Sequence, residues 1–252
     1  MHPILFQLGP VTLYSYGLAI AAGFLLAASL AARRARAAGL DPARVQRVAL
    51  IGLLAGLAGG RAAYVFLNWD LYRADPLEIL RLDHGGLVFY GGLAAGVLAG
   101  VAAIRAAKLP LLATLDLLMP PLVLAHAIGR IGCFLNGCCY GKPTALPWGV
   151  LFPQDILYRH PTQLYEAGAL LAIFVVLKRI EDCPQEKRSL PAGTGLLAYG
   201  LLYGVWRFLA EFLRGDNPPV LWGFTAFQLA SLPLALFCGC LLLLRLRPLR
   251  QR

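Results

Sequence analysis

Residues 15–36 read SYGLAIAAGFLLAASLAARRAR, an apolar run that ends in a cluster of arginines. No charged residue occurs between positions 15 and 32, so the run is long enough to cross about 30 Å of hydrocarbon as a helix. Arg33, Arg34 and Arg36 then mark the return to water. The pattern predicts a membrane-spanning helix followed by a basic loop.

Six more apolar runs follow, each bounded by charged residues, Pro or Gly. The predicted spans cover approximately residues 15–33, 48–68, 86–104, 111–129, 163–177, 194–213 and 224–244. We therefore expect an all-α integral membrane protein with seven transmembrane helices. Residues 1–252 are expected to form a single membrane domain, with an outer-face loop region at 130–162.

The composition of the whole chain agrees with this interpretation. Of its 252 residues, 59% are hydrophobic and 14% are charged, and the mean hydropathy is +0.66. Soluble domains average about 45–50% apolar and about 25% charged residues. A net charge of +10 in a soluble protein would suggest nucleic acid, but in a membrane protein it is typical of basic cytoplasmic loops. No nucleic-acid partner is expected.

The basic residues also predict an orientation. Alternate connections, together with the C-terminal tail, carry 15 Lys and Arg residues, whereas the opposite side carries 6. Cytoplasmic loops are enriched in Lys and Arg. The N-terminus is therefore expected outside and the C-terminus in the cytoplasm.

Charged residues inside predicted spans are the first functional candidates, because burying a charge in a bilayer is costly. On the sixth span, spacings of three and four place one polar stripe on a single helix face: Tyr199, Tyr203, Arg207, Glu211 and Arg214. The stripe is interpreted either as a structural ion pair or as the lining of an anion site. Arg61 in the second span is likewise either a structural partner of a carbonyl or carboxylate, or a binding residue.

Two further regions offer binding residues near the outer face. The third span opens with His84, and Gly86 and Gly91 flank Tyr90 at its start, where small residues leave room for a ligand. Gly92, Gly96 and Gly100 then form a small-residue row that favours close helix packing. After His126 and Arg130, glycines at 129, 132, 137 and 141 predict a tight loop whose backbone N–H groups hold anions. His126 is expected to be a packing residue.

The outer cysteines leave several alternatives open. Cys133 with Cys138 or Cys139 is compatible with a disulfide in an oxidising compartment. A zinc site with His126 or His160 and a reactive thiol beside Arg130 are also compatible with the sequence.

These residues, in this order, resemble the bacterial prolipoprotein diacylglyceryl transferase family. The resemblance covers nearly the whole chain and rests on the following motifs: His2-Pro3 and Tyr16-Gly17-Leu18; Gly60-Arg61 with Tyr64; Gly85-Gly86 and Gly91-Gly92; Gly129-Arg130-Ile131-Gly132 followed by Asn136-Gly137; His160-Pro161-Thr162-Gln163-Leu164-Tyr165-Glu166; and Arg207-Phe208 with Glu211-Phe212 and Arg214. Tyr90, Cys133 and Cys138 stand where the family often has His, Asn and Glu.

The resemblance implies an enzyme that moves a diacylglyceryl group from phosphatidylglycerol to the lipobox cysteine of a prolipoprotein signal peptide, releasing glycerol phosphate. It implies no metal or other cofactor, a bacterial cytoplasmic (inner) membrane location, membrane lipids as surroundings, and an active site toward the periplasmic face.

A mechanism follows from this implied reaction. Arg130 and Arg207 are expected to bind the phosphate, with Glu211 orienting Arg207. His84 or Tyr90 is expected to take the thiol proton. The substrate-binding candidates are Tyr16, Arg61, Gly86, Gly91, Asn136, Gly141, His160, Gln163 and Arg214.

Three other functions compete with this interpretation. Polar stripes also suit a small-solute membrane transporter, although the repeat symmetry common in transporters is not evident. A thiol-redox protein would use the three outer cysteines. A related lipid transferase with a different acceptor would carry the same donor site.

Overall fold

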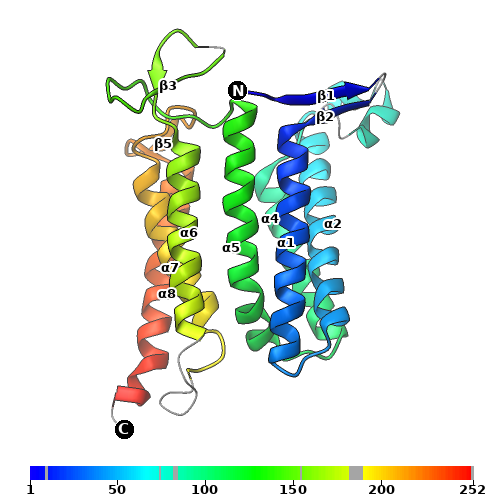
Figure 1. Ribbon diagram of the computed structural model, residues 1–252, viewed down its shortest axis with the longest axis vertical. Coiled ribbons are helices and arrows are strands. Elements are labelled where there is room, and N and C mark those ends of the chain that lie inside the picture. Colours follow the sequence, from blue (N-terminus) through cyan, green and yellow to red (C-terminus); the bar gives the residue numbers. More distant parts are fainter. Residues whose placement is uncertain (9–10, 74, 82–84, 154, 182–189, 251–252) are drawn as a thin grey trace. The chain divides into compact units, whose positions relative to one another are not determined.

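A computed structural model describes residues 1–8, 11–73, 75–81, 85–153, 155–181 and 190–250 (Figure 1). The long helices are α1 (Ser15–Ala37), α2 (Pro42–Leu67), α4 (Phe89–Ala106), α5 (Leu111–Asn136), α6 (Thr162–Glu181), α7 (Thr194–Ala210) and α8 (Ala226–Arg250). The short helix α3 (Trp69–Tyr72) and the 3-10 helix η1 (Pro76–Leu80) lie between α2 and α4.

The strands form three small antiparallel hairpins at the ends of the helices. They pair β1 (Ile4–Leu8) with β2 (Val11–Tyr14), β3 (Val150–Leu151) with β4 (Tyr158–Arg159), and β5 (Pro219–Leu221) with β6 (Phe224–Thr225). The chain is therefore mostly helical, as the sequence predicts.

Among the described helices, five are long and apolar enough to cross a membrane: α1, α2, α4, α5 and α8. Helices α6 and α7 form over the other two predicted spans, 163–177 and 194–213. The apolar helices support a multi-pass membrane protein.

Some predicted boundaries are wrong. α5 runs to Asn136, so Gly129 and Gly132 are helical rather than part of the predicted anion-binding loop. The helix continues because Ile131, Phe134 and Leu135 extend its apolar sequence. At Gly132 a Cβ atom would lie 2.7 Å from the Cβ of Ala19, so this glycine allows α1 to approach α5.

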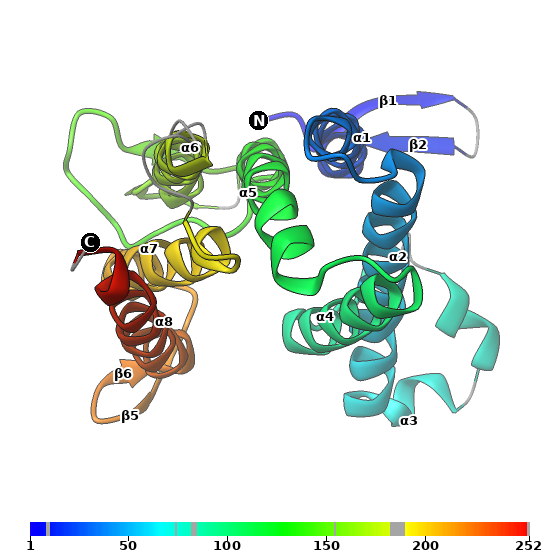
Figure 2. The same ribbon diagram turned by 90° about the horizontal axis from the view of Figure 1, so that it is seen from below.

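The chain divides into two compact units, one of residues 1–30 with 115–252 and the other of residues 31–114. The core of the first unit joins α5, α6 and α7 through buried apolar side chains: Met119, Val123, Ala127, Leu170, Ile173, Leu177 and Ala198. α7 also lies beside α8 in both views (Figures 1 and 2). There, a Cβ atom on Gly204 would lie 3.0 Å from the Ser231 carbonyl oxygen.

Glycines hold α2 against α4 in the second unit. A Cβ atom on Gly92 would lie 2.9 Å from the Gly56 carbonyl oxygen, and one on Gly96 would lie 3.1 Å from that of Gly52. The small-residue row therefore packs as predicted at these two positions. Gly100 differs, because a Cβ atom there would meet nothing within 4 Å.

Candidate active site

One buried carboxylate on α6 joins three helices of the first unit. Glu166 is 1% exposed, and its Oε1 lies 3.0 Å from Arg130 Nη2 on α5. The same oxygen accepts a hydrogen bond of 2.9 Å from the Tyr203 hydroxyl on α7. Glu166 Oε2 lies 3.6 Å from Arg207 Nη1, also on α7. The two arginines predicted to bind phosphate thus converge on Glu166.

His126 lies one helical turn before Arg130 and belongs to the same cluster. The Arg130 Nε–H donates to His126 Nε2 over 3.3 Å, so Nε2 is the acceptor and the imidazole proton resides on Nδ1. The imidazole ring lies edge-on to Tyr203, with ring centroids 5.3 Å apart. We call these five residues (Glu166, Arg130, Arg207, Tyr203 and His126) the Glu166 network.

A second carboxylate, Glu211, holds Arg207 from the C-terminal end of α7, one turn further along the chain. Glu211 forms an ion pair with Arg207 Nη2, the i,i+4 contact that the sequence predicts. Thr225 donates to Glu211 Oε2 over 2.8 Å, and Asn217 Nδ2 lies 3.0 Å from both carboxylate oxygens. The Arg207 guanidinium also packs 4.5 Å from the centroid of the Phe227 ring. Thr225 and Asn217 therefore hold Glu211 in place, and Glu211 in turn orients Arg207.

Charge in this region is balanced. Arg214 donates to Asp216 through Nε over 2.9 Å, and its Nε lies 3.8 Å from Glu211. Three guanidinium groups thus face three carboxylates, which reduces the cost of burying each ion. Arg207 Nη1 is a buried donor that has no hydrogen-bond acceptor among the described residues. An incoming anion would satisfy it.

The loop after α5 is tied to the start of α6. Thr162 Oγ1 donates to the Cys139 carbonyl over 2.8 Å, and Gln163 Nε2 donates to the Cys138 carbonyl over 2.5 Å. Gly141 pairs with Arg214 as an isolated β-bridge, and a Cβ atom on it would lie 2.6 Å from the Leu213 carbonyl oxygen. Gln163 and Gly141 therefore fix the loop that lies beside the network.

The other predicted residues of this unit have separate surroundings. Tyr16 lies on α1 and is 40% exposed, and Asn136 is the last residue of α5. His160 Nδ1 lies 3.3 Å from the Tyr165 hydroxyl, which accepts a hydrogen bond from the Trp148 indole. The His160 side chain therefore contacts Tyr165, and the described residues show no contact between His160 and Glu166.

The second unit holds the remaining candidates. Arg61 is buried and donates to backbone carbonyls of the segment before α4, including Glu78 over 2.6 Å and Arg81 over 3.0 Å. These contacts favour the structural alternative for Arg61. Gly86 has a φ of +81°, and a Cβ atom on it would lie 2.8 Å from Arg61 Nη1.

Gly91 faces Gly59 of α2, so its observed role is helix packing. Tyr90 is 47% exposed and lies edge-on to Phe89, with ring centroids 5.5 Å apart. His84 lies outside the described residues.

Sequence reasoning did not include Glu166 among the site residues, nor Asn217, Asp216 and Thr225. Glu166 is the only acidic residue in the predicted span 163–177, and a carboxylate inside a span is itself a functional signal. The partners of Glu211 lie on a loop and on β6, where the sequence carries no comparable signal.

Comparison with known proteins finds similar chains over nearly the whole length of this sequence. A relative from Clostridium tetani is 36% identical over 224 residues, which cover 86% of either chain. One from Wolbachia pipientis subsp. Culex pipiens is 36% identical over 255 residues, covering 94% of this chain and 92% of its own. One from Vibrio cholerae is 36% identical over 244 residues, covering 94% and 88%.

All three relatives are named phosphatidylglycerol–prolipoprotein diacylglyceryl transferase. The family model described as prolipoprotein diacylglyceryl transferase matches residues 3–244. With nearly the whole sequence matched, the chain belongs to the prolipoprotein diacylglyceryl transferase family.

Proposed function

We propose that this protein transfers the diacylglyceryl group of phosphatidylglycerol to the lipobox cysteine thiol of a prolipoprotein. The cysteine sulfur attacks the glycerol carbon that bears the phosphate ester, and a carbon–sulfur bond forms as the carbon–oxygen bond breaks. The oxygen keeps the electron pair and leaves as glycerol phosphate, while the thiol proton passes to a base. The convergence of Arg130 and Arg207 on one buried carboxylate is the observation that carries the proposal.

The two guanidinium groups supply electrostatic stabilisation in this reaction. Negative charge shifts to the phosphate oxygen as the carbon–oxygen bond breaks, and fixed donors at that position contribute about 2.7–4 kcal/mol each. Glu166 and Glu211 hold Arg207 between them, so the donor is oriented before the substrate arrives. A phosphate oxygen would accept a hydrogen bond from Nη1 of Arg207, which has no acceptor among the described residues.

The remaining predicted site residues are part of the same proposal. His84 or Tyr90 takes the thiol proton. Head-group hydroxyls or the peptide backbone contact Tyr16, Asn136 and Gln163, while Gly86, Gly91 and Gly141, which lack side chains, let the segments around the substrates pack closely. His160 and Arg214 complete the polar surroundings, and Arg61 holds the segment before α4 in place through its backbone carbonyls. No cofactor takes part.

The proton acceptor has its own test. An imidazole has an ordinary pKa of about 6.5, so it can still accept a proton near that pH. Few free thiols are ionised at that pH, so the reaction depends most on a base there. His84→Ala should therefore lower the transfer rate more at mildly acidic pH than at neutral pH. Tyr90→Phe serves as the parallel variant. An unchanged pH profile in His84→Ala would assign the proton to another group.

The proposal also fixes the setting of the reaction. In this proposal the chain crosses the bacterial inner membrane seven times as a single domain, and the excess of Lys and Arg on alternate connections supports an outside N-terminus and a cytoplasmic C-terminus. The active site then faces the periplasm, where a secreted prolipoprotein signal peptide meets the outer leaflet.

Purified Arg130→Ala and Arg207→Ala variants test the function. Labelled phosphatidylglycerol and a lipobox peptide are supplied, and transfer of label to the peptide is measured. Both variants should lose transfer while remaining monodisperse, whereas Arg73→Ala, which removes an exposed partner of Asp70, should retain it. Near-normal transfer by either site variant would refute the phosphate role. Transfer to a peptide whose lipobox cysteine is replaced by serine would show a different acceptor chemistry.

A further inference from the structure

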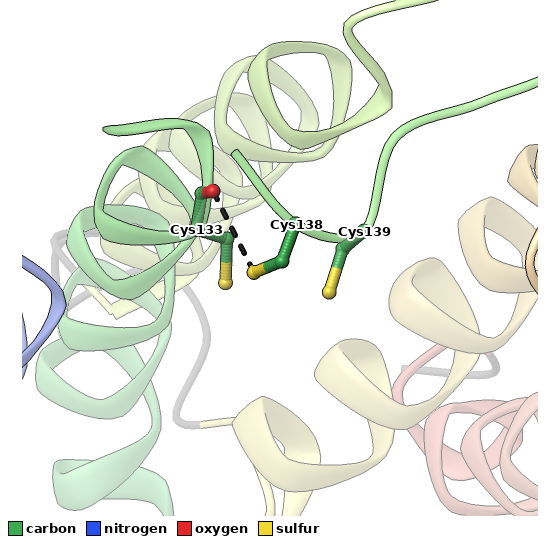
Figure 3. A group of neighbouring side chains, drawn as sticks. All are labelled: Cys133, Cys138 and Cys139. Carbon is green, nitrogen blue, oxygen red and sulfur yellow. Dashed lines mark hydrogen bonds between the residues drawn. The ribbon is translucent and has the colours of Figure 1, made fainter. Parts of the chain in front are cut away.

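Three cysteines gather where α5 ends and the following loop begins. Cys133 is the fourth-last residue of α5, and Cys138 and Cys139 lie in the loop. Their sulfur atoms all lie within 4.8 Å of one another. Figure 3 shows the three side chains pointing to the same side of this segment. We call Cys133, Cys138 and Cys139 the thiol cluster.

The backbone of the loop is shaped to bring these sulfurs together. Cys139 has a φ of +63°, a left-handed conformation that costs free energy for a residue with a side chain. The hydrogen bonds from Thr162 and Gln163 to the carbonyls of Cys139 and Cys138 hold the loop in place. A Cys138 Sγ–H contact of 3.6 Å to the Cys133 carbonyl ties the loop to α5 (Figure 3).

The thiol cluster is open to ions from solvent. Cys133 is buried, while Cys138 and Cys139 are half-buried, so an ion from solvent has a route to the sulfurs.

The ligand set selects a class of ion. Three thiolates are soft donors, and soft donors prefer Cu⁺ and Zn²⁺ to hard cations. Structural zinc sites are almost always four-coordinate. Within the described part of the chain, no His, Asp or Glu joins the three sulfurs. A monovalent soft cation accepts three sulfur ligands and needs no fourth.

From this geometry we infer that Cys133, Cys138 and Cys139 form a three-thiolate binding site for a monovalent thiophilic cation, with Cu⁺ as the best match. Each sulfur that binds loses its proton to solvent if it still carries one, and no electron is transferred. The site is independent of the lipid-transfer proposal, because none of its ligands belongs to the Glu166 network.

The binding test uses the full-length chain in detergent under anaerobic, reducing conditions. Cys183, Cys238 and Cys240 are replaced by serine, so that only the cluster thiols remain. Cu⁺ is supplied in competition with a chromogenic Cu⁺ chelator. We expect one Cu⁺ per chain, with ultraviolet absorption from sulfur-to-copper charge transfer. Cys133→Ser, Cys138→Ser and Cys139→Ser should each weaken binding by about tenfold or more, because changes even to outer-shell partners cost about 10–100-fold.

A protection experiment on the unaltered sequence does not depend on how the variants fold. Maleimide labelling is followed at each cysteine by peptide mass spectrometry, with and without Cu⁺. Cu⁺ should slow labelling of all three cluster thiols and leave Cys240, which is exposed, unaffected. Equal labelling with and without Cu⁺ would overturn the proposal. So would stoichiometric Zn²⁺ binding in the absence of Cu⁺ binding, or a disulfide within the cluster that persists in the reduced protein.

Discussion

At the scale of single residues, Glu166 does more than its place in the sequence suggests. A carboxylate that is 1% exposed would be severely penalised alone, but here Arg130, Arg207 and Tyr203 all contact it. The same contacts hold the two arginines at one position in the molecule. Glu166 therefore positions Arg130 and Arg207, the two arginines that we propose bind phosphate.

Replacing that carboxylate tests the role of the whole network. Glu166→Gln keeps the size of the side chain but removes its charge, which leaves one positive charge in excess and weakens the contacts of Arg130 and Arg207. Breaking a buried ion pair costs about 3–5 kcal/mol, so thermal unfolding in detergent should begin at a clearly lower temperature. Lipid transfer should fall as well. The control is Asp70→Asn, whose carboxylate is 93% exposed and should be neutral. An unchanged Glu166→Gln variant would contradict the assignment.

The Tyr203 hydroxyl gives a finer test of the same contact. Tyr203→Phe removes only the hydrogen bond to Glu166, and a hydrogen bond to a charged group is worth about 1.5–3 kcal/mol. We expect lower thermal stability and a reduced transfer rate with Arg130 and Arg207 still present. Combining Tyr203→Phe with Glu166→Gln should add little beyond Glu166→Gln, and fully additive losses would show that the two residues act separately.

The sequence predicts these contacts unequally for a physical reason. The pair of Arg207 and Glu211 follows from helix geometry, because residues four apart share a face. The contact of Glu166 with Arg130 depends on how α5 and α6 pack, and no local spacing encodes that. The same limit applies to Thr225, which reaches Glu211 from β6.

At the scale of elements, the contact between α2 and α4 shows how glycine sets the distance between helices. Gly59 and Gly91 face each other so closely that a Cβ atom on either would lie 2.7 Å from the carbonyl oxygen of the other. The regular glycine spacing in α4 made a close helix neighbour predictable. The identity of that neighbour, α2, was not predictable, because the glycine spacing does not indicate which helix packs against it.

This packing predicts opposite effects for two similar substitutions. Gly59→Ala should destabilise the protein by about 1–3 kcal/mol, because its methyl group would overlap the Ala95 side chain and the Gly91 backbone. Gly100→Ala in α4 meets nothing within 4 Å and should stabilise the helix by about 0.5–1 kcal/mol. Thermal unfolding of both variants checks the pair. Equal effects would mean that helix propensity, not helix contact, governs these glycines.

The start of α7 depends on a side chain from α5. Asp116 accepts hydrogen bonds from the backbone N–H groups of Gly193, over 2.5 Å, and Leu196, over 2.8 Å. Asp116→Ala should therefore cost about 1 kcal/mol, as for the loss of a helix cap, and should speed hydrogen exchange in the first turn of α7. Asp116→Asn keeps one acceptor oxygen and should have an intermediate effect. Unchanged exchange in both variants would show that α7 begins without this cap.

At the scale of the whole molecule, the candidate residues divide between the two compact units. Residues 115–252 supply the Glu166 network and the thiol cluster, whereas residues 31–114 supply Arg61 and the segment that leads to Tyr90. Hydropathy predicts where helices form in both units, because apolar length is a local property. The division into compact units is not local, because it depends on which helices pack together.

Orientation in the membrane is the prediction that belongs to the complete chain. The excess of Lys and Arg on alternate connections places Ala38 on the cytoplasmic side and Ile156, which is 93% exposed, on the outer side. In intact spheroplasts, a membrane-impermeant maleimide should label Ile156→Cys, and it should reach Ala38→Cys only after the membrane is permeabilised. Peptide mass spectrometry reads each position separately, so the native cysteines need not be removed. Labelling of Ala38→Cys in intact spheroplasts, with Ile156→Cys protected, would reverse the topology. Glu166 lies near the start of α6, the helix that follows Ile156, so a reversed topology would leave the Glu166 network on the side opposite a secreted substrate.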